Sequence, residues 1–405
     1  MEETTRIPIK NIRIGFLTYG MHSTITGIGR YTIELTYALK ARYPLDIVLI
    51  SPYPDSPLSW YRDFPVYPVP TLRRLPSVLA FGSAMLSKAA HQLDLDILHD
   101  PCGIAPFFGR WPDRVRRIVT IHDAIPLHHP QYQPWLTRFV FGQVLPRMRD
   151  RTDAVITDSE NARQDLLREL GYRPDQVAVT YPGVHMPSTE ELQQWQAEGE
   201  ATRRQWGIPS PYFLFVSAVS PRKNVPRLLE AFAQVKHLVP QVALVLVGPS
   251  TPEISSRISQ MEDLGQSIFT LGYVDEPSLH RLYANAEAVV YPSLYEGFGL
   301  PALEAMAHGT PVITSNTSSL PEVMGNVGWL VDPTDMTALA QAMLAVLQNP
   351  QQRDQARVEG RQRAEAFSWQ STAAATWDVY QKVLANNASP PSRSGVPSRS
   401  AKTRR

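Results

Sequence analysis

Residues 291–311 read YPSLYEGFGLPALEAMAHGTP and carry the clearest structural signal in this chain. A strand is predicted to end near Tyr291. The loop that follows contains Gly297 and Gly299, whose lack of a side chain lets the backbone approach a ligand. Pro301 stands where the first residue of a helix is expected. The segment therefore predicts a strand, a glycine-rich loop and a helix in succession, which is the repeating unit of parallel α/β folds.

Short runs rich in Val and Ile alternate with helix-length amphipathic segments on both sides of this unit. This alternation is typical of parallel strands joined by crossover helices. Strands are predicted near 12–17, 47–50, 97–99, 117–121, 154–157, 176–180, 213–217, 243–247, 268–271, 288–291, 311–314 and 328–331. Because the pattern runs twice, the sequence predicts an α/β protein with two Rossmann-like, doubly wound domains. Ligand sites are expected in the loops that follow the strands.

The domain boundaries follow from breaks in this alternation. A polar, Glu- and Gln-rich stretch bounded by prolines interrupts it in the middle of the chain, and a last amphipathic helix is expected to pack back toward the first domain. The final twenty residues hold five basic and no acidic side chains and too few apolar groups to fold. The predicted parts are a first domain over 11–187, a linker over 188–211, a second domain over 212–367, the helix over 368–385 and a disordered basic tail over 386–405.

The composition excludes several classes of protein. Apolar residues make up 43% and charged residues 19%, as in a globular chain. The 39 Lys and Arg against 38 Asp and Glu give a net charge of +1, so no overall field would recruit nucleic acid. Cys102 is the only cysteine, which excludes an internal disulfide and a thiolate zinc site. Without a signal-peptide pattern or an apolar run of about 18 residues, we expect a cytoplasmic protein.

Two carboxylates flank the start of the helix predicted at Pro301. The free amides and the positive dipole end of that helix would form an anion site suited to a diphosphate. Glu296 lies in the loop just before it, and Glu304 lies about one turn above it, roughly 4.5 Å along the axis. Carboxylates repel a diphosphate but accept hydrogen bonds from sugar hydroxyls. For Glu304 alone the alternative is a first-turn Glu that complements the helix dipole, but the combination favours a binding site.

Glu296 and Glu304, with seven residues between them, and the surrounding EGFGLPALEAMAHGTPVI resemble the signature of the retaining glycosyltransferases of family 4. The resemblance implies the GT-B fold, in which two Rossmann-like domains face a cleft and bind a nucleotide sugar. It also implies that Glu296 contacts the transferred sugar and that Glu304 binds the nucleotide ribose. The loop amides that would hold the diphosphate belong to Gly297, Phe298, Gly299 and Leu300.

A basic pair, Arg222 and Lys223, is predicted where the first strand of the second half leads into a helix. A solvated surface pair is the alternative. The context resembles the family's Arg-Lys-Asn element, which implies that both cations neutralise the donor diphosphate as it leaves. The family usually has Gly near Ser217 or Ala218, and this chain does not, so the backbone approach to the donor is expected to differ there.

In the first half, residues 26–31 read TGIGRY before a helix. They resemble the family's glycine-rich loop, which implies that Gly27 and Gly29 close over the donor phosphates, whereas a simple helix-start turn is the alternative. A dinucleotide fingerprint is excluded because Thr32 occupies the third glycine position. His122 follows a predicted strand and resembles the family's His-Asp element, which implies a place beside the transferred sugar. A structural role is the alternative for this histidine.

Two further patterns bear on metals and membranes. The pair Asp94 and Asp96 mimics the Asp-x-Asp metal motif of another glycosyltransferase fold, but it precedes a strand instead of following one, so we expect metal independence. The basic amphipathic stretches 72–93 and 135–151 either contact a membrane surface peripherally or pack as helices on the sheet. Both interpretations stay open at this point.

The resemblance implies a retaining hexosyltransferase that uses a nucleoside diphosphate sugar as co-substrate and no other cofactor. GDP-mannose is the first expectation for the donor, with UDP-sugars and other GDP-sugars next, and a glycan or lipid-linked hydroxyl is expected as acceptor. A front-face displacement, in which the leaving diphosphate takes the acceptor proton, is the expected mechanism. The alternatives are a nucleotide-sugar-binding protein without turnover and a sugar-nucleotide epimerase on the same architecture.

Overall fold

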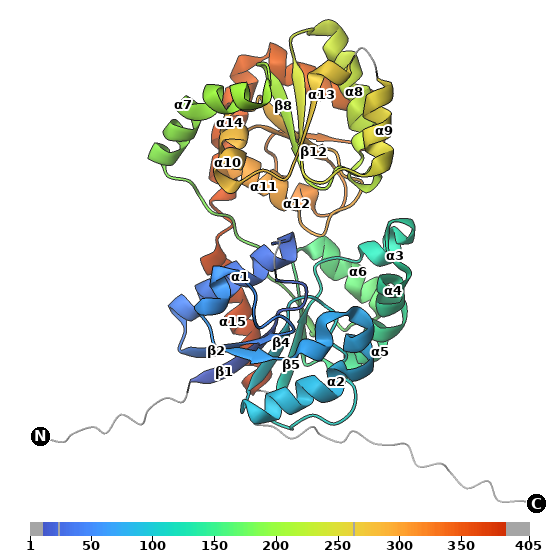
Figure 1. Cartoon of the computed structure of the whole chain (residues 1–405), viewed down its shortest axis with the longest axis vertical. Coiled ribbons are helices and arrows are strands. Elements are labelled where there is room, and N and C mark those ends of the chain that lie inside the picture. The colour runs from blue at the N-terminus through green and yellow to red at the C-terminus, as the bar shows by residue number, and fades with distance from the viewer. Residues whose placement is uncertain (1–10, 23–24, 262–263, 386–405) are drawn as a thin grey trace, which may run out of the picture.

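The computed structural model describes residues 11–22, 25–261 and 264–385, and it consists of two lobes stacked along the long axis (Figure 1). Each lobe is built on one sheet, seven-stranded in the amino-terminal lobe and six-stranded in the carboxy-terminal lobe. Every strand pairing recorded within the two sheets is parallel. The predicted α/β architecture of two Rossmann-like lobes is confirmed, while the predicted tail 386–405 lies outside the described residues.

The amino-terminal sheet has the strand order β3-β2-β1-β4-β5-β6-β7. Ile14 of the interior strand β1 is fully buried and pairs with Ile47 on one side and Ile97 on the other, as in a parallel sheet that is covered on both faces. The short strand β3 was not predicted, since it contains Pro68 and lies at the sheet edge. The strands are β1 (Ile12–Leu17), β2 (Leu45–Ser51), β3 (Val66–Pro68), β4 (Ile97–Asp100), β5 (Arg116–Thr120), β6 (Ala154–Thr157) and β7 (Val177–Val179).

Helices cover both faces of this sheet. They are α1 (Gly27–Arg42), α2 (Leu75–Gln92), α3 (Ile125–His128), α4 (Trp135–Phe139), α5 (Leu145–Met148) and α6 (Glu160–Leu170). The basic stretch 135–151 is largely helical, with a π-helical turn over Val140–Val144 between α4 and α5. Pro146 at the start of α5 explains this irregularity, because proline has no backbone N–H to donate to the preceding turn and its ring crowds the carbonyl there.

The carboxy-terminal sheet repeats the same winding, in the order β10-β9-β8-β11-β12-β13. Its strands are β8 (Tyr212–Val216), β9 (Ala243–Val247), β10 (Ile268–Gly272), β11 (Ala288–Tyr291), β12 (Val312–Ser315) and β13 (Trp329–Val331). Its helices are α8 (Val225–Leu238), α9 (Pro252–Gln260), α10 (Glu276–Asn285), α11 (Leu300–Ala307), α12 (Leu320–Met324), α13 (Met336–Gln348) and α14 (Pro350–Ala364). Because β8 and β11 are neighbours, the loops after these two strands meet at one point.

The chain crosses between the lobes twice, at residues 181–187 and again at residues 367–369. The two crossings are hydrogen-bonded, with the Val184 amide 3.0 Å from the Phe367 carbonyl oxygen. They also pack without room for a side chain, because a Cβ at Gly183 would lie 2.2 Å from the Trp369 nitrogen. The two connections therefore form one compact joint between the lobes.

The segment 188–211, interpreted from sequence as a linker, is mostly a helix of the carboxy-terminal lobe. Helix α7 (Thr189–Trp206) starts at a capping box in which the side chains of Ser188 and Glu191 bond each other's backbone amides. It packs on α10, where Arg281 Nε lies 2.5 Å from Glu198 Oε2. The capping box fixes the start of α7 at the beginning of this segment. The chain therefore crosses between the lobes before Ser188.

Helix α15 (Trp369–Ala385) returns to the amino-terminal lobe, where it packs against α1 and β6 (Figure 1). The side chains of Trp369, Ala373 and Tyr380 are buried. Tyr380 OH lies 2.7 Å from Nδ1 of His99, whose Nε2 lies 2.8 Å from Thr120 Oγ1. This buried chain of hydrogen bonds ties the last helix to the centre of the sheet.

The bond between Tyr380 and His99 gives a prediction about stability. Burial lowers the pKa of His99 to about 3, so the ring is neutral. Each ring nitrogen has its own hydrogen-bond partner, Tyr380 OH at Nδ1 and Thr120 Oγ1 at Nε2. Tyr380→Phe leaves Nδ1 without that partner and should lower the free energy of unfolding by about 1 to 3 kcal/mol, measured by urea denaturation. In the control, Tyr43→Phe keeps the ring that stacks on Trp377 of the same helix and should stay within about 0.5 kcal/mol of wild type. Equal losses in both variants would contradict the prediction.

Candidate active site

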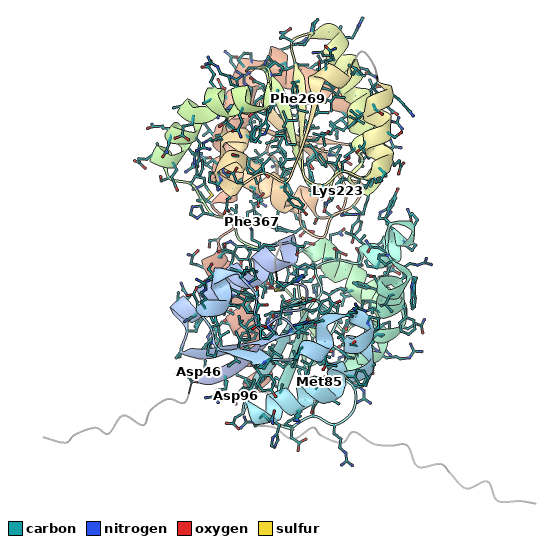
Figure 2. All side chains as sticks on the ribbon, in the orientation of Figure 1. Asp46, Met85, Asp96, Lys223, Phe269 and Phe367 are labelled. Atoms are coloured by element: carbon teal, nitrogen blue, oxygen red, sulfur yellow. The ribbon has the colours of Figure 1, made fainter. Side chains whose placement is uncertain are left out.

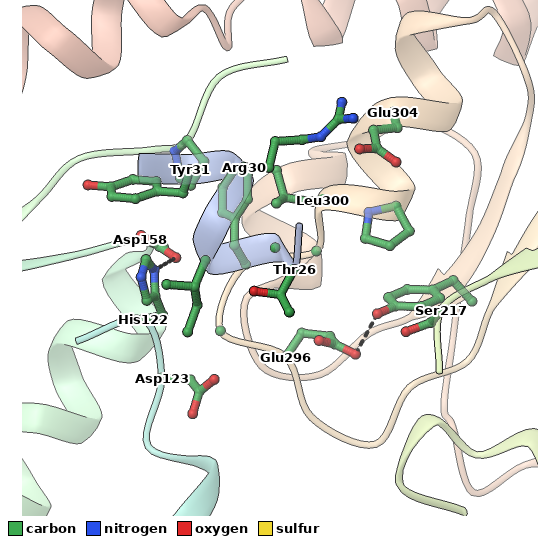
Figure 3. Close-up of a pocket in the computed structure, with 18 of the residues that line it drawn as sticks. Thr26, Arg30, Tyr31, His122, Asp123, Asp158, Ser217, Glu296, Leu300 and Glu304 are labelled. Atoms are coloured by element: carbon green, nitrogen blue, oxygen red, sulfur yellow. Dashed lines mark hydrogen bonds and ion pairs between the residues drawn. The ribbon is translucent and has the colours of Figure 1, made fainter. Parts of the chain in front are cut away.

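A cleft of about 380 Å³ lies between the lobes, at the carboxyl ends of their central strands. Figure 3 shows side chains from both lobes pointing into it. The amino-terminal lobe contributes the start of α1 and the loops after β5 and β6, and the carboxy-terminal lobe contributes the loops after β8 and β11 with the start of α11. Its lining includes Thr26, Gly27, Arg30, Tyr31, His122, Asp123, Asp158, Ser217, Lys223, Tyr291, Glu296, Gly297, Phe298, Gly299, Leu300 and Glu304.

The loop after β11 brings the lobes into contact. A Cβ at Gly297 would lie 2.4 Å from the His122 carbonyl oxygen in the opposite lobe, so a side chain here would force the two loops apart. Gly299 has φ +120, a conformation that residues with side chains rarely adopt, and it stands directly before α11. Both glycines are therefore needed for the loop to enter the cleft and then start the helix.

Glu296 and Lys223 form a buried ion pair at the floor of the cleft. Lys223 Nζ lies 2.6 Å from Glu296 Oε1, and both groups hydrogen-bond Tyr291 OH, at 2.6 and 2.8 Å. Burial lowers the pKa of Lys223 below its ordinary value, against the opposing effect of the Glu296 charge. Burial also acts to raise the pKa of Glu296, but the nearby Lys223 and Arg222 cations outweigh it and the net shift is downward. The carboxylate is thus held ionised.

Glu304 occupies the opposite side of the loop, on α11. Its Oε2 accepts a hydrogen bond from Tyr283 OH at 3.0 Å. Burial raises the pKa of Glu304, partly offset by the charge of Arg30. Arg30 reaches across from α1 and pairs with Glu276 of the other lobe at 2.7 Å. Two acidic side chains, Glu296 and Glu304, therefore flank the start of α11, as the spacing predicted.

His122 is held at both ring nitrogens. Nδ1 lies 2.7 Å from Asp158 Oδ2, and Nε2 lies 2.9 Å from the Pro101 carbonyl oxygen. A carbonyl oxygen only accepts, and an ionised carboxylate also only accepts, so both nitrogens donate and the ring is an imidazolium. Burial lowers the pKa of His122, but the Asp158 charge outweighs this and raises it to about 8. The ring therefore supplies positive charge at the cleft, and neither nitrogen is free to take a proton.

The structure brings most of the predicted residues to one place, with two qualifications. Gly27 lines the cleft, whereas Gly29 is buried in the first turn of α1, where its amide lies 3.4 Å from Thr26 Oγ1. Arg222 stands beside the cleft, outside its lining, and donates to the Tyr295 carbonyl oxygen at 3.3 Å.

Sequence reasoning did not single out Arg30, Tyr31, Asp158 or Tyr291. Tyr31 packs edge-on against His122 with ring centres 4.9 Å apart, and Asp158 orients the same histidine. Asp158 directly follows β6, so the rule that sites follow parallel strands offered a signal for it. The ion pair of Arg30 depends on the contact between lobes, and the packing of Tyr31 on His122 depends on the folded amino-terminal lobe, so no local pattern contains either contact.

The Asp94 and Asp96 pair lies far from the cleft. Asp96 Oδ2 accepts a hydrogen bond from the Arg13 amide at 2.9 Å before β4 begins. Figure 2 shows Asp96 near the end of its lobe remote from Lys223. Within residues 11–22, 25–261 and 264–385, no three His, Cys, Asp or Glu side chains gather as a metal ion would require.

Two protein families match this chain. The family described as Glycosyl transferases group 1 matches residues 199–363, and the family described as Glycosyltransferase Family 4 matches residues 25–186. Together they span both lobes and confirm the resemblance found in the sequence.

Curated relatives and solved structures agree with the family matches. O-antigen chain mannosyltransferase B of Escherichia coli is 30% identical, over 91% of this chain and 100% of its own length. The MMP alpha-(1->4)-mannosyltransferase of Mycolicibacterium hassiacum is 35% identical, over 66% of this chain and 63% of its own length. The sucrose-phosphate synthase structure from Thermosynechococcus elongatus has a TM-score of 0.73 at 24% identity, covering 93% of this chain and 100% of its own. This last likeness concerns the fold alone.

The doubly donating His122 predicts a pH dependence of stability. Its pKa in the folded protein, about 8, lies above the ordinary value of 6.5, so the folded state binds the proton more tightly than the unfolded state. This difference contributes about 2 kcal/mol to the free energy of unfolding. The contribution is fully present below pH 6.5 and is lost as the pH rises through 8. Urea denaturation of the wild type and of His122→Gln should show a difference that shrinks between pH 6.5 and pH 9. A difference that stays constant over this range would contradict the assignment of an imidazolium.

Proposed function

Because this chain belongs to the group 1 glycosyltransferases, with a Glycosyltransferase Family 4 amino-terminal half, we propose that it transfers mannose from GDP-mannose to an acceptor hydroxyl with retention at the anomeric carbon. The observation that carries the proposal is the pair of acidic side chains, Glu296 and Glu304, on either side of the free amides at the start of α11. A nucleoside diphosphate sugar has the matching order of groups, with hydroxyls on both sides of a diphosphate.

In this proposal Glu296 accepts hydrogen bonds from the transferred sugar. Its Oε1 is already bonded by Lys223 and Tyr291, which fixes the position of the carboxylate. Glu304 binds the ribose hydroxyls. The amides of the loop from Gly297 to Leu300 hold the diphosphate, whose negative charge suits the amino end of a helix.

The proposed chemistry is a front-face displacement. The acceptor oxygen bonds to the anomeric carbon while the bond from that carbon to the diphosphate oxygen breaks, and the acceptor proton passes to the departing diphosphate. Arg222, Lys223 and the loop amides stabilise the charge that grows on the leaving group. These cations take the place that a divalent metal has in other transferases, so the proposed mechanism is metal-independent and uses no cofactor besides the nucleotide sugar.

The choice of mannose rests on the relatives. Both relatives described above are named mannosyltransferases, and one acts on the O-antigen chain, as its name states. A glycan or lipid-linked hydroxyl is therefore the proposed acceptor, with polysaccharide assembly as the setting. Neither an epimerase nor a binding protein without turnover is favoured by these relatives.

A lipid-linked acceptor would place the protein at a membrane surface, and one face of the amino-terminal lobe suits peripheral contact. Trp135 is 73% exposed and Phe139 is 46% exposed on α4, and Arg138 and Arg147 are exposed close by. Residues 124–149 contain no carboxylate side chain. No helix in the described part of the chain is long and apolar enough to cross a bilayer. We propose that this face, at the cytoplasmic side, contacts anionic lipid.

Substitutions at the floor of the cleft test the transfer. With GDP-mannose and an acceptor extract, release of GDP should depend on the acceptor. Lys223→Ala should lower turnover by roughly 100-fold or more, because it removes a cation from the leaving group.

The two glutamates should differ in their effects. Glu296→Gln should also abolish most transfer while GDP still binds, and Glu304→Ala should mainly weaken the binding of GDP. Lys236→Ala, which removes a lysine bonded to the Val242 carbonyl away from the cleft, is the control. Binding of GDP-mannose without acceptor-dependent release would contradict the proposal.

Vesicle binding tests the membrane face. Wild-type protein should co-sediment with vesicles rich in phosphatidylglycerol, less so with pure phosphatidylcholine, and salt should weaken the binding. The double substitution Trp135→Ala and Phe139→Ala should reduce the bound fraction severalfold. Tyr273→Ala, the control, removes a side chain that is 74% exposed on the other lobe and should leave the fraction of protein bound to vesicles unchanged. Equal binding of all three proteins would contradict this proposal.

A further inference from the structure

The first turn of α6 is a point where the two lobes hold each other. Glu322 of α12, in the carboxy-terminal lobe, accepts two hydrogen bonds from backbone amides of α6. Its Oε2 lies 2.8 Å from the Glu160 nitrogen, and its Oε1 lies 2.7 Å from the Asn161 nitrogen. Amides at a helix start lack partners within the helix, and the dipole there favours a carboxylate. In Figure 1 α12 and α6 face each other between the lobes.

The residues directly before these amides bond to both halves of the active site. Asp158 orients His122, as described above. Ser159, which is fully buried, donates from Oγ to the Gly297 carbonyl oxygen at 2.7 Å. Four successive residues, 158–161, thus contact the histidine of one lobe, the loop that carries Glu296 in the other lobe, and Glu322.

Glu322 is itself fixed firmly in its own lobe. Its neighbours Leu320 and Val323 are fully buried in the carboxy-terminal core. Arg363 of α14 donates to the Val323 carbonyl oxygen at 3.0 Å and so holds the end of α12. Tyr181, on the first crossing, donates to Glu322 Oε2 at 3.2 Å. A short, anchored helix presents this carboxylate to α6, so movement of α6 is transmitted to the lobe as a whole.

We propose that Glu322 is a positioning residue for the transfer reaction. By holding the start of α6, it sets the alignment of His122 with the Glu296 loop in the closed cleft. The inference rests on the proposed function for its activity measurement only, since the contact between the lobes exists without substrate. Glu322 lies outside the lining of the cleft, so it acts on the reaction through the position of other groups.

The variants separate the contributions of charge and geometry. Glu322→Ala removes both acceptors, whereas Glu322→Gln keeps the size but turns an amide N–H₂ group toward a backbone N–H. Glu322→Asp keeps the charge and both acceptor oxygens on a shorter side chain. This variant should therefore retain part of the wild-type lobe spacing and activity. Glu253→Ala and Glu253→Gln make the same chemical changes at an exposed first-turn position of α9, on the same lobe, and serve as controls.

The experiment measures lobe spacing and kinetics on the full chain. Nitroxide labels at Gln143→Cys and Ser259→Cys, one exposed site on each lobe, report the spacing by pulsed electron resonance. Burial holds the pKa of the native Cys102 thiol well above its usual value, so that residue should resist labelling. Glu322→Ala and Glu322→Gln should broaden the distance distribution toward an open form. They should lower kcat/KM for transfer by roughly 10- to 100-fold, since a small misplacement is costly. The Kd of GDP should stay within about threefold, because the proposed GDP contacts, Glu304 and the loop amides, all lie in the carboxy-terminal lobe and do not depend on the spacing of the lobes.

Each outcome bears on the inference separately from the proposed function. A wild-type distance distribution in Glu322→Ala and Glu322→Gln would overturn it, whatever the activity. A loss of transfer matched by an equal loss of GDP affinity and of melting temperature would also overturn it, since that pattern indicates damage to the fold. If the wild type shows no transfer at all, the proposed function fails while the spacing measurement still decides the role of Glu322.

Discussion

The buried pair of Glu296 and Lys223 constrains the rest of the active site. Removing two charges from water costs several kcal/mol per ion unless they are paired and hydrogen-bonded. Here the pair is 2.6 Å apart, and Tyr291 bonds both partners. The two charges come from different loops, one after β8 and one after β11, and they meet because these strands are neighbours in the sheet. The doubly wound strand order is therefore the reason that the charges can be buried together.

Close packing between the lobes is the second requirement. Gly297 leaves no room for a side chain against the His122 carbonyl, and Ser159 bonds the carbonyl of the same glycine. The loop that carries Glu296 is thus held from both sides, by Lys223 in its own lobe and by α6 in the other. The compact joint near Gly183 and Phe367 also limits how the lobes can turn. The spacing of the lobes therefore depends on the loop contacts and on the joint together.

The sequence predicts the fold and those parts of the site that lie within one loop or helix, but few of the contacts between the lobes. Glu296 and Glu304 were predictable because a loop and one helical turn fix their spacing, and Lys223 because it follows a strand. That Lys223 pairs with Glu296, and that both nitrogens of His122 are engaged, depends on atoms brought together by the sheet order and by Asp158. Glu322 lies in an ordinary-looking short helix, and its partners, the α6 amides and Tyr181 OH, lie far from it in the sequence. The position of α7 could have been read from its capping box, whose signal marks a helix start at Ser188.

The charges in the cleft indicate which cation meets the diphosphate first in the proposed reaction. Lys223 is already paired with Glu296, Arg30 with Glu276, and His122 with Asp158. Arg222 donates to the neutral Tyr295 carbonyl oxygen, so within the described residues it has no hydrogen-bonded carboxylate to give up. A diphosphate that recruits Lys223 must share it with Glu296, which weakens the hold on that carboxylate. Arg222 can turn from a neutral acceptor to an anion without breaking a hydrogen-bonded ion pair. Its place just outside the cleft lining then suits a side chain that enters only when the donor is bound.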